Sequence, residues 1–304
     1  MRKAKKDQVS TLLNAEELKN FSQKVTSTVC GGCGNHCLLT INTFQDGKRF
    51  VSGNRCDKPV TGKASDDSLD LYAYKLKSLL KYAEDKGTGK RGTIGIPFCL
   101  NMYELLPFWH AFWTHLGFQV VVSPVSTREI YQEGQGTIPS DTVCYPAKLA
   151  HGHIEELLKL NVDAIFYPCL SYNFDEGLGD NHYNCPIVAY YPEVLEGNVQ
   201  ALSKTKLIRD FLNIADRSEF EKRLPAIMQK HFPNIEEEEL TAALDAAYAE
   251  YDAHMQDIRE EGERIIAKAR AEKKHIIVLA GRPYHVDPEV NHGIPETICS
   301  LGMV

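Results

Sequence analysis

The sequence lacks several features that would assign a function directly. No apolar run is long enough to span a membrane, and the basic start MRKAKKDQ has no apolar segment behind it, as a secretory signal would. Neither a GxxxxGK(S/T) phosphate loop nor a glycine-rich dinucleotide motif after a strand occurs, and the GxSxG motif is missing. These absences argue against a membrane protein, a nucleotide-binding domain and a serine hydrolase of the GxSxG type.

The charge balance also narrows the choice. Lys and Arg number 34 against 41 Asp and Glu, so the net charge of −7 argues against a generic nucleic-acid-binding protein. A length of 304 residues suggests about two domains. Nine cysteines are many for a chain without an export signal, and they point to metal or redox chemistry in a reducing cytoplasm rather than to disulfides.

The first 25 residues predict a short N-terminal helix, because apolar residues recur at helical spacing over residues 10–25. Its apolar positions are Leu13, Leu18, Phe21 and Val25.

Residues 26–62 predict a small cysteine-rich module that binds a metal. Between the third and fourth cysteines, alternating apolar residues and an Asp46-Gly47 turn indicate a β-hairpin, which would bring the fourth cysteine back to the others. Four thiolates fit structural zinc and fit a [4Fe–4S] cluster equally well, and His36 could replace one cysteine on zinc. The expected ligands are Cys30, Cys33, Cys37 and Cys56.

Residues 63–202 predict an α/β domain. A helical pattern over LYAYKLKSLLKYA leads into four expected parallel strands, at residues 93–96, 119–122, 164–167 and 187–191. The helix after the first strand carries an aromatic stripe, which is typical of packing against the sheet. Its members are Phe108, Trp109, Phe112 and Trp113.

Residues 203–273 predict a polar helical connector, and residues 274–304 the start of a second α/β unit. The longest helical pattern in the connector begins with IEEEEL and ends with AKARAEKK, a charge order that suits the helix dipole. After it, HIIVLA predicts a strand and PETICSL predicts a helix, in the same order of elements as in the first unit. The second unit is expected to be cut off in its second strand.

Two cysteines occupy positions suited to a cluster in the first α/β domain. Cys144 precedes a helix and Cys169 follows a strand, so both can face the crevice at the carboxyl edge of the sheet. Two residues compete to be the third ligand. Cys185 precedes the predicted strand at 187–191, more than about 10 Å from that edge, whereas Cys99 directly follows the first strand.

Polar residues near these cysteines are candidates for substrate contact. They lie in the helix after Cys144, behind the expected fourth strand, and in the loop GRPYHVDPEVNHG, whose polarity after a strand favours anion or substrate binding. The candidates are His151, His153, Glu193, Arg282, His285 and His292.

Several longer motifs together resemble a known family. LNMYELLPFW, TIPSDTVCYPAKLAHGHI, DAIFYPCLSYNFDE, NCPIVAYYPEV and AGRPYHVDPEVNHGIPE resemble the domain attached to CoA-substrate-specific enzyme activases. They are more distantly similar to the iron–sulfur subunits of 2-hydroxyacyl-CoA dehydratases. CGGCGNHC with GNRC is similar to the cysteine-rich segment before this domain in large activase-like proteins.

The resemblance implies Rossmann- or flavodoxin-like domains and an oxygen-sensitive [4Fe–4S] site held by cysteines at their interface. It implies low-potential electron transfer in anaerobes, with an activase ATPase domain as partner and an acyl-CoA or another small molecule as substrate. It supports Cys144 and Cys169, and it favours Cys185 over Cys99 as third ligand. The ATPase part itself is absent. The alternative function is a zinc-stabilised, non-catalytic module that docks the activase ATPase.

Overall fold

The structure is a computed structural model that describes residues 14–31, 36–45, 47–54, 58–61, 67–175, 177 and 179–304. The chain divides into two compact units, Met1–Ser65 and Asp66–Val304. Within the described part of the chain, no helix is long and apolar enough to cross a membrane.

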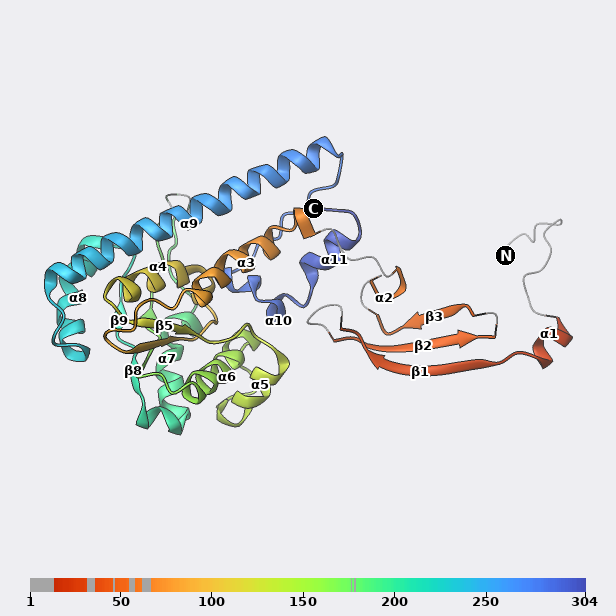
Figure 1. Ribbon diagram of the computed structural model, residues 1–304, viewed down its shortest axis with the longest axis horizontal. Helices are drawn as coiled ribbons and strands as arrows, with labels where there is room; N and C mark the ends of the chain where they lie inside the picture. The colour runs from red at the N-terminus through yellow and green to blue at the C-terminus, as the bar shows by residue number, and fades with distance from the viewer. Residues whose placement is uncertain are drawn as a thin grey trace. The chain divides into compact units, whose positions relative to one another are not determined.

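The N-terminal unit contains a three-stranded antiparallel sheet (Figure 1). Its strands are β1 (Gln23–Val29), β2 (Leu38–Phe44) and β3 (Arg49–Ser52), between the short helices α1 (Ala15–Lys19) and α2 (Lys58–Thr61). β2 and β3 form the predicted hairpin, and Gly47 in its turn has φ 79°, a conformation that favours glycine. The hairpin prediction is therefore confirmed.

The predicted helix over residues 10–25 is wrong for most of its length. Of the described residues, only Ala15–Lys19 is helical, and Val25 lies in β1. β1 is rich in β-branched residues, and all seven of its residues pair with β2, so sheet pairing prevails over the helical spacing. Leu13 lies outside the described residues.

The second unit is built on a four-stranded parallel sheet in the order β5-β4-β6-β8. The strands are β4 (Thr93–Ile96), β5 (Gln119–Val122), β6 (Ala164–Phe166) and β8 (Lys206–Ile208). A short parallel pair, β7 (Cys169–Leu170) with β9 (Phe211–Leu212), extends it. The first three predicted strands are confirmed.

The fourth predicted strand, at residues 187–191, is wrong. These residues belong to helix α7 (Pro186–Asn198), and β8 is the fourth strand instead. Pro186 stands at the first helical position, where its missing N–H costs nothing. Val188, Tyr191 and Leu195 recur at helical spacing and are buried, so the run of apolar residues forms one helix face rather than a strand.

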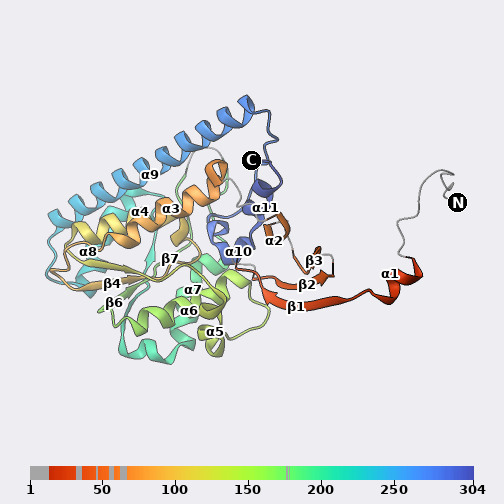
Figure 2. The ribbon, with the colours of Figure 1, turned by 45° about the vertical axis from the view of Figure 1, so that its right-hand side comes forward.

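Helices cover both faces of the sheet (Figures 1 and 2). On one side, α4 (Met102–His115) packs against α3 (Leu71–Glu84) and α9 (Glu237–Ala271), and α8 (Arg217–His231) packs on α9. On the other side lie α5 (Arg128–Gly134), α6 (Tyr145–Lys159) and α7. The aromatic stripe of α4 is buried in the core as predicted, with Trp109 and Trp113 both against Phe166 of the sheet.

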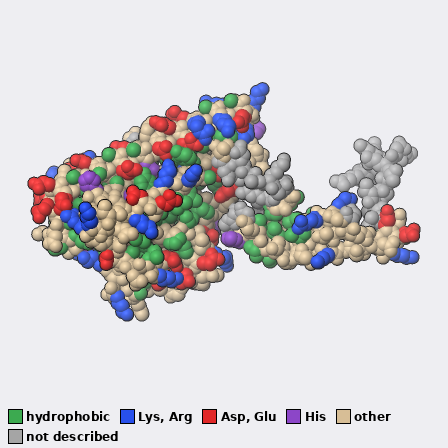
Figure 3. Space-filling view, in the orientation of Figure 1, with side chains coloured by type: hydrophobic (Ala, Val, Ile, Leu, Met, Phe, Trp, Pro, Cys, Tyr) green, Lys and Arg blue, Asp and Glu red, His purple; other side chains and the backbone are tan. Residues whose placement is uncertain are grey.

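The prediction of a helical connector over residues 203–273 needs one correction. α8 and α9 are helical as expected, but residues 206–208 form β8 and residues 211–212 form β9. β8 pairs with β6, because Leu207 and Ile208 continue the buried surface of the sheet. α9 begins with three glutamates and ends near Lys268 and Arg270, and Figure 3 shows a mixture of acidic and basic side chains along it.

The C-terminal segment is irregular at its start and helical afterwards. The expected strand at 275–280 is not formed as a strand, but the Ile277 N–H donates to Val304 O (2.6 Å) and the Val304 N–H to His275 O (2.8 Å), as in parallel strands. The predicted helix at PETICSL is present as α11. The remaining short elements are η1 (Asp67–Leu69), η2 (Gln135–Thr137), η3 (Gln200–Lys204), η4 (Pro283–Val286), α10 (Pro288–Asn291) and α11 (Ile294–Ser300).

Candidate functional site

The candidate site lies at the carboxyl ends of β4 and β6. The strand order places β4 between β5 and β6, and the helix that follows β4 covers one face while those that follow β5 cover the other. Such a switch point opens a crevice at the strand ends, where ligands bind in open α/β sheets. The loops and helix starts at this edge carry four of the five cysteines of the second unit, all but Cys299.

Cys144 and Cys185 occupy equivalent positions at the starts of two helices. Cys144 caps α6 with φ −64° and ψ 152°, and Cys185 caps α7 with φ −63° and ψ 153°. A proline follows each of them in the first two helical positions, and neither side chain caps its own helix. Both sulfur atoms are therefore left available at helix N-termini, which favour negatively charged groups.

Tyr284 in η4 connects the two cysteines. Its pKa is raised, first by burial and then by the negative charge that Cys185 and Cys144 would carry as thiolates. Cys144 also acts on Tyr191 of α7, whose pKa is raised to about 12, mainly by burial. Cys144 and Cys185 thus both act electrostatically on Tyr284, and Cys144 acts on Tyr191 as well.

Cys169 lies in a different environment. It is buried in β7, its backbone N–H donates to Asp210 O (3.2 Å), and the charged groups that act on it are Glu193, Arg209 and Asp210. Burial raises the pKa of its thiol to about 11. In this conformation Cys169 is a neutral core thiol, and its role as a ligand stays a prediction.

Cys99, the other candidate for third ligand, is also part of the core. Its side chain is 2% exposed, and its sulfur lies 3.7 Å from the Tyr167 hydroxyl. Burial raises the pKa of this thiol to about 12. Cys99 therefore matches a small buried side chain better than a ligand.

His151 is buried beneath the site and fully hydrogen-bonded. The Thr137 hydroxyl donates to Gly134 O (2.9 Å), so its oxygen accepts from His151 Nδ1 (2.8 Å). His151 Nε2 then accepts from the Tyr191 hydroxyl (2.9 Å). Burial lowers the pKa of His151 to about 4, so the ring is neutral and orients Tyr191 beside Cys144.

His153 belongs to a second buried chain of hydrogen bonds. The Ser126 hydroxyl donates to the carboxylate of Asp287, so its oxygen accepts from His153 Nε2 (2.9 Å). His153 Nδ1 accepts from Ser123 (2.8 Å), whose oxygen accepts the Phe98 N–H (2.8 Å). Burial lowers the pKa of His153 to about 3 and raises that of Asp287 to about 6. The chain fastens the segment that carries Tyr284 to the sheet.

The same segment has a second attachment at the start of α6. The Tyr145 hydroxyl donates to Glu289 (2.7 Å), and the ring of His292 stacks on Tyr145 with centroids 6.2 Å apart. His292 has φ 55°, in the left-handed region. Of the residues proposed for substrate contact, His292 is thus the one beside the helix that begins at Cys144.

The other proposed contact residues are placed around the edge of the site. Glu193 is exposed on α7 and pairs with Arg209 (3.0 Å). Arg282 is exposed, and its N–H donates to Nδ1 of His285 (3.0 Å). His151 and His153 are fully buried, so they act on the site through their hydrogen-bond partners.

In the N-terminal unit, Cys30 and Cys37 flank the connection between β1 and β2. The Cys30 N–H donates to Cys37 O (2.9 Å), and both cysteines are partly exposed. Cys33 and Cys56 lie outside the described residues. Among the residues that are described, no three His, Cys, Asp or Glu side chains converge to hold a metal ion, so both predicted metal sites stay predictions.

Sequence reasoning missed Tyr191, Tyr284 and Asp287. They stand in the motifs NCPIVAYYPEV, RPYHV and HVDPEV, where the prediction selected Cys185, Glu193, the histidines and the arginine instead. A tyrosine and an aspartate in the same loop were equally able to reach the strand ends. Only the fold shows which of these side chains do so.

The parallel sheet with its switch point and the cysteines at helix starts define a class of α/β protein with thiols at the sheet's carboxyl edge. Comparison with protein families identifies the family: the chain belongs to the CoA enzyme activase uncharacterised domain family (DUF2229), which residues 93–304 match. Comparisons with curated proteins and with solved structures give no match.

Proposed function

We propose that this protein is an iron–sulfur component of a CoA enzyme activase system. In this proposal Cys144, Cys185 and Cys169 supply thiolates to a [4Fe–4S] cluster at the carboxyl edge of the sheet. A bound cluster would supply low-potential one-electron transfer, for the reduction or dehydration of an acyl-CoA or another small molecule. The activase family gives the setting for this proposal.

The observation that carries the proposal is the equivalence of Cys144 and Cys185. Their matching cap geometry and their common neighbour Tyr284 support two thiolates that face the same ligand. Helix N-termini stabilise anionic ligands, and both cysteines are at least partly accessible. The correction of residues 187–191 from strand to helix favours Cys185 further, because a helix start lies at the active edge.

Cys144 and Cys185 fit two ligand positions of a cluster. The third position depends on Cys169. Cys169 would have to turn out of the core and lose its proton, against burial that raises its pKa to about 11. Cys99 would face the same barrier, with a pKa of about 12. Tyr284 would border the site, while the hydroxyl of the buried Tyr191 donates to His151.

The proposal also includes a second α/β unit that starts within residues 274–304. The two hydrogen bonds between residues 275–277 and Val304 follow the parallel pattern, and α11 lies between the paired segments. A cluster between two α/β units would then be bordered by η4, which follows the first segment of the second one.

Elemental analysis tests the proposal. After anaerobic purification and reconstitution, we expect iron and acid-labile sulfide in the protein, with absorbance near 400 nm on the order of that of other iron–sulfur proteins. Zinc without iron or acid-labile sulfide would contradict the proposal. Comparing Cys169→Ala with Cys99→Ala identifies the third ligand: only the true ligand's loss removes iron.

A second candidate function rests on the N-terminal unit. Cys30 and Cys37 lie next to each other at one end of a small sheet, a placement typical of zinc-stabilised modules. A non-catalytic module that docks the activase ATPase would then contain zinc and no iron. The same elemental analysis separates the two functions.

A further inference from the structure

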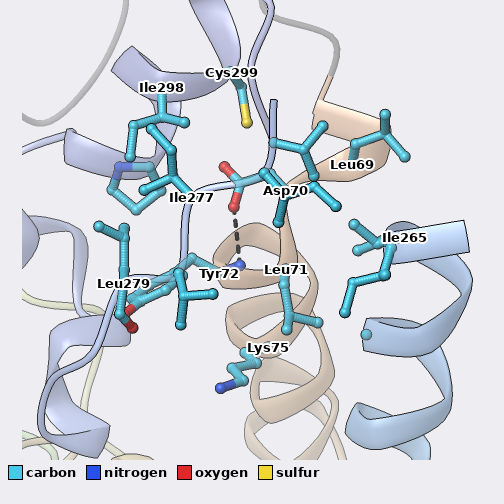
Figure 4. Close-up of a pocket in the computed structure, with 16 residues that line it drawn as sticks. Leu69, Asp70, Leu71, Tyr72, Lys75, Ile265, Ile277, Leu279, Ile298 and Cys299 are labelled. Carbon is cyan, nitrogen blue, oxygen red and sulfur yellow. Dashed lines mark hydrogen bonds between the residues drawn. The ribbon is translucent and has the colours of Figure 1, made fainter. Parts of the chain in front are cut away.

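A cavity of about 330 Å³ lies in the second unit, away from the cysteine site. It is bordered by the start of α3, the last turns of α9, the segment 276–279 and α11, and it is partly open to solvent (Figure 4). Its walls are almost entirely aliphatic. They include Leu71, Ile265, Ile277, Leu279, Ile298 and the thiol-bearing Cys299.

Specific contacts hold these walls in place. The Tyr72 hydroxyl donates to Leu279 O (3.2 Å), which ties the segment 276–279 to α3. The Ile277 N–H donates to Val304 O (2.6 Å), which fixes the opposite end of that segment. The cavity is therefore preformed rather than a gap between loose loops.

The size and lining of the cavity favour an apolar occupant. An aliphatic cavity of about 150 Å³ in another protein stays dry and binds benzene. The present cavity is about twice that size, so it has room for an alkyl chain of about eight carbons, which is little larger than benzene. Water gains few hydrogen bonds from such walls, so its displacement by an alkyl chain is favourable.

Two charged side chains line the cavity: Figure 4 shows the Asp70 carboxylate among the aliphatic side chains and Lys75 at the lower edge. The Asp70 carboxylate accepts the N–H groups of Tyr72 (2.9 Å) and Ala73 (3.1 Å), and so caps α3. The Lys75 ammonium makes no ion pair with any described residue and lies 5.9 Å from the Tyr72 ring centroid. Burial lowers the pKa of Lys75, while the charge of Glu104 raises it.

A second cavity of about 210 Å³ adjoins the first at Lys75. Both are lined by Tyr72, Lys75 and Leu279, and the second adds Glu104, His254 and Arg282. The aliphatic cavity thus opens at Lys75 toward a more polar space. This gives the pair of cavities an apolar end and a polar end, where two cationic side chains, Lys75 and Arg282, stand beside one carboxylate, Glu104.

We propose that these cavities bind a small amphipathic carboxylate, with an alkyl chain of about eight carbons in the aliphatic cavity and the carboxylate on the Lys75 ammonium. The site is separate from the thiol site, and it does not depend on the function proposed there. Its ligand is recognised by chain length at one end and by one charge at the other.

Titration of the full chain with octanoate tests the proposal by calorimetry. A charge-assisted contact with Lys75 predicts that Lys75→Met weakens octanoate binding by about tenfold or more. Lys77→Met is the matched control, because Lys77 is exposed on the same helix, and it should leave the affinity within about twofold. Octanol, which lacks the charge, should bind both variants alike. Equal octanoate affinity in Lys75→Met, or no saturable binding by the wild type, overturns the proposal.

Cys299 provides a second readout inside the cavity. Bound octanoate should slow the alkylation of Cys299 by iodoacetamide several-fold, while Cys144 outside the cavity reacts as before. Ile298→Trp fills the aliphatic cavity and should abolish both binding and protection. If octanoate binds without protecting Cys299, the ligand lies elsewhere and the proposed site is wrong.

Discussion

His151 and His153 lie two residues apart on α6, yet their hydrogen bonds require opposite tautomers. His151 carries its proton on Nδ1, because Thr137 has already given its own proton to Gly134. His153 carries its proton on Nε2, because Ser126 donates to Asp287. Neither chain has an acceptor for a second ring proton, so both histidines stay neutral while the protein is folded.

These buried groups predict how stability depends on pH. The folded-state pKa of each histidine lies below 6.5, so its contribution is present above about pH 6.5 and is lost as the pH falls toward about 4. On acidification from pH 7 to pH 5, each histidine lowers the free energy of unfolding by about 2 kcal/mol. Asp287 acts in the opposite direction: because its pKa is raised in the folded state, it adds about 1 kcal/mol of stability over the same range. The two histidines together outweigh Asp287, so acidification from pH 7 to pH 5 should destabilise the protein.

Urea unfolding at pH 7 and pH 5 checks this balance. The wild type should lose more stability on acidification than the variant His153→Gln, by about 2 kcal/mol. Asp287→Asn serves as the complementary variant, and it should lose more stability than the wild type on acidification. Equal pH dependence in all three proteins would contradict the buried, neutral state of His153.

Cysteine reactivity offers a second prediction for single residues. In metal-free protein at pH 8, iodoacetamide should label the exposed Cys144 at least about tenfold faster than Cys99 or Cys169, which are buried and have pKa values of about 12 and 11. Peptide mapping by mass spectrometry measures each rate. Rapid labelling of Cys169 would show that it leaves the core readily, and would strengthen its case as a ligand.

At the scale of elements, α5 and α6 approach each other closely enough to require glycine. A Cβ on Gly152 would lie 1.8 Å from Ile130 O, and a Cβ on Gly134 would lie 2.2 Å from the Gly152 N. Gly152 stands between the two buried histidines, so the helix contact also holds their rings in place. The sequence HGH is explained by this contact.

Gly152→Ala should therefore destabilise the second unit by about 3 kcal/mol or more, because backbone must move to accept the methyl group. Gly197→Ala is the matched control: it also lies in a helix, nothing stands within 4 Å of its added Cβ, and it should stabilise by up to about 1 kcal/mol. Thermal unfolding followed by circular dichroism measures both. A Gly152→Ala variant as stable as the wild type would refute the close contact.

The elements also show where sequence reasoning succeeds and where it stops. Strands β4, β5 and β6 were predictable, because each is a short apolar run closed by proline or glycine. α7 was mistaken for a strand because five consecutive apolar residues carry no period, and β8 was missed because Lys206 and its polar surroundings hide a three-residue strand. That one error moved Cys185 to the wrong edge of the sheet.

For the whole molecule, the site could be predicted only as a set of cysteines. Their positions beside helices and strands follow from local patterns, and Cys144 needed nothing more. The electrostatic effect of Cys144 and Cys185 on Tyr284 joins residues far apart in the chain, and neither periodicity nor spacing encodes it. The buried role of His153 and Asp287 was likewise beyond local patterns, since it requires the C-terminal segment to return to the sheet.

The N-terminal unit predicts a metal dependence of its own. Leu39 is its only buried hydrophobic residue among those described, and a small sheet with so little core usually needs a metal or another cross-link. A metal chelator, or Cys30→Ala, should therefore unfold this unit and leave the α/β unit folded. Limited proteolysis should then release fragments from Met1–Ser65 alone. Resistance of this unit to proteolysis in the chelator would contradict the prediction.

The most direct test of the proposed cluster is the iron content of a double variant. Cys144→Ala/Cys185→Ala, reconstituted anaerobically beside the wild type, should lose about four iron atoms per chain, which is one [4Fe–4S] cluster. Cys99→Ala/Cys299→Ala is the control with the same number of thiols removed, and it should keep the wild-type iron content. Iron content that is unchanged in Cys144→Ala/Cys185→Ala would contradict the assignment of these two cysteines.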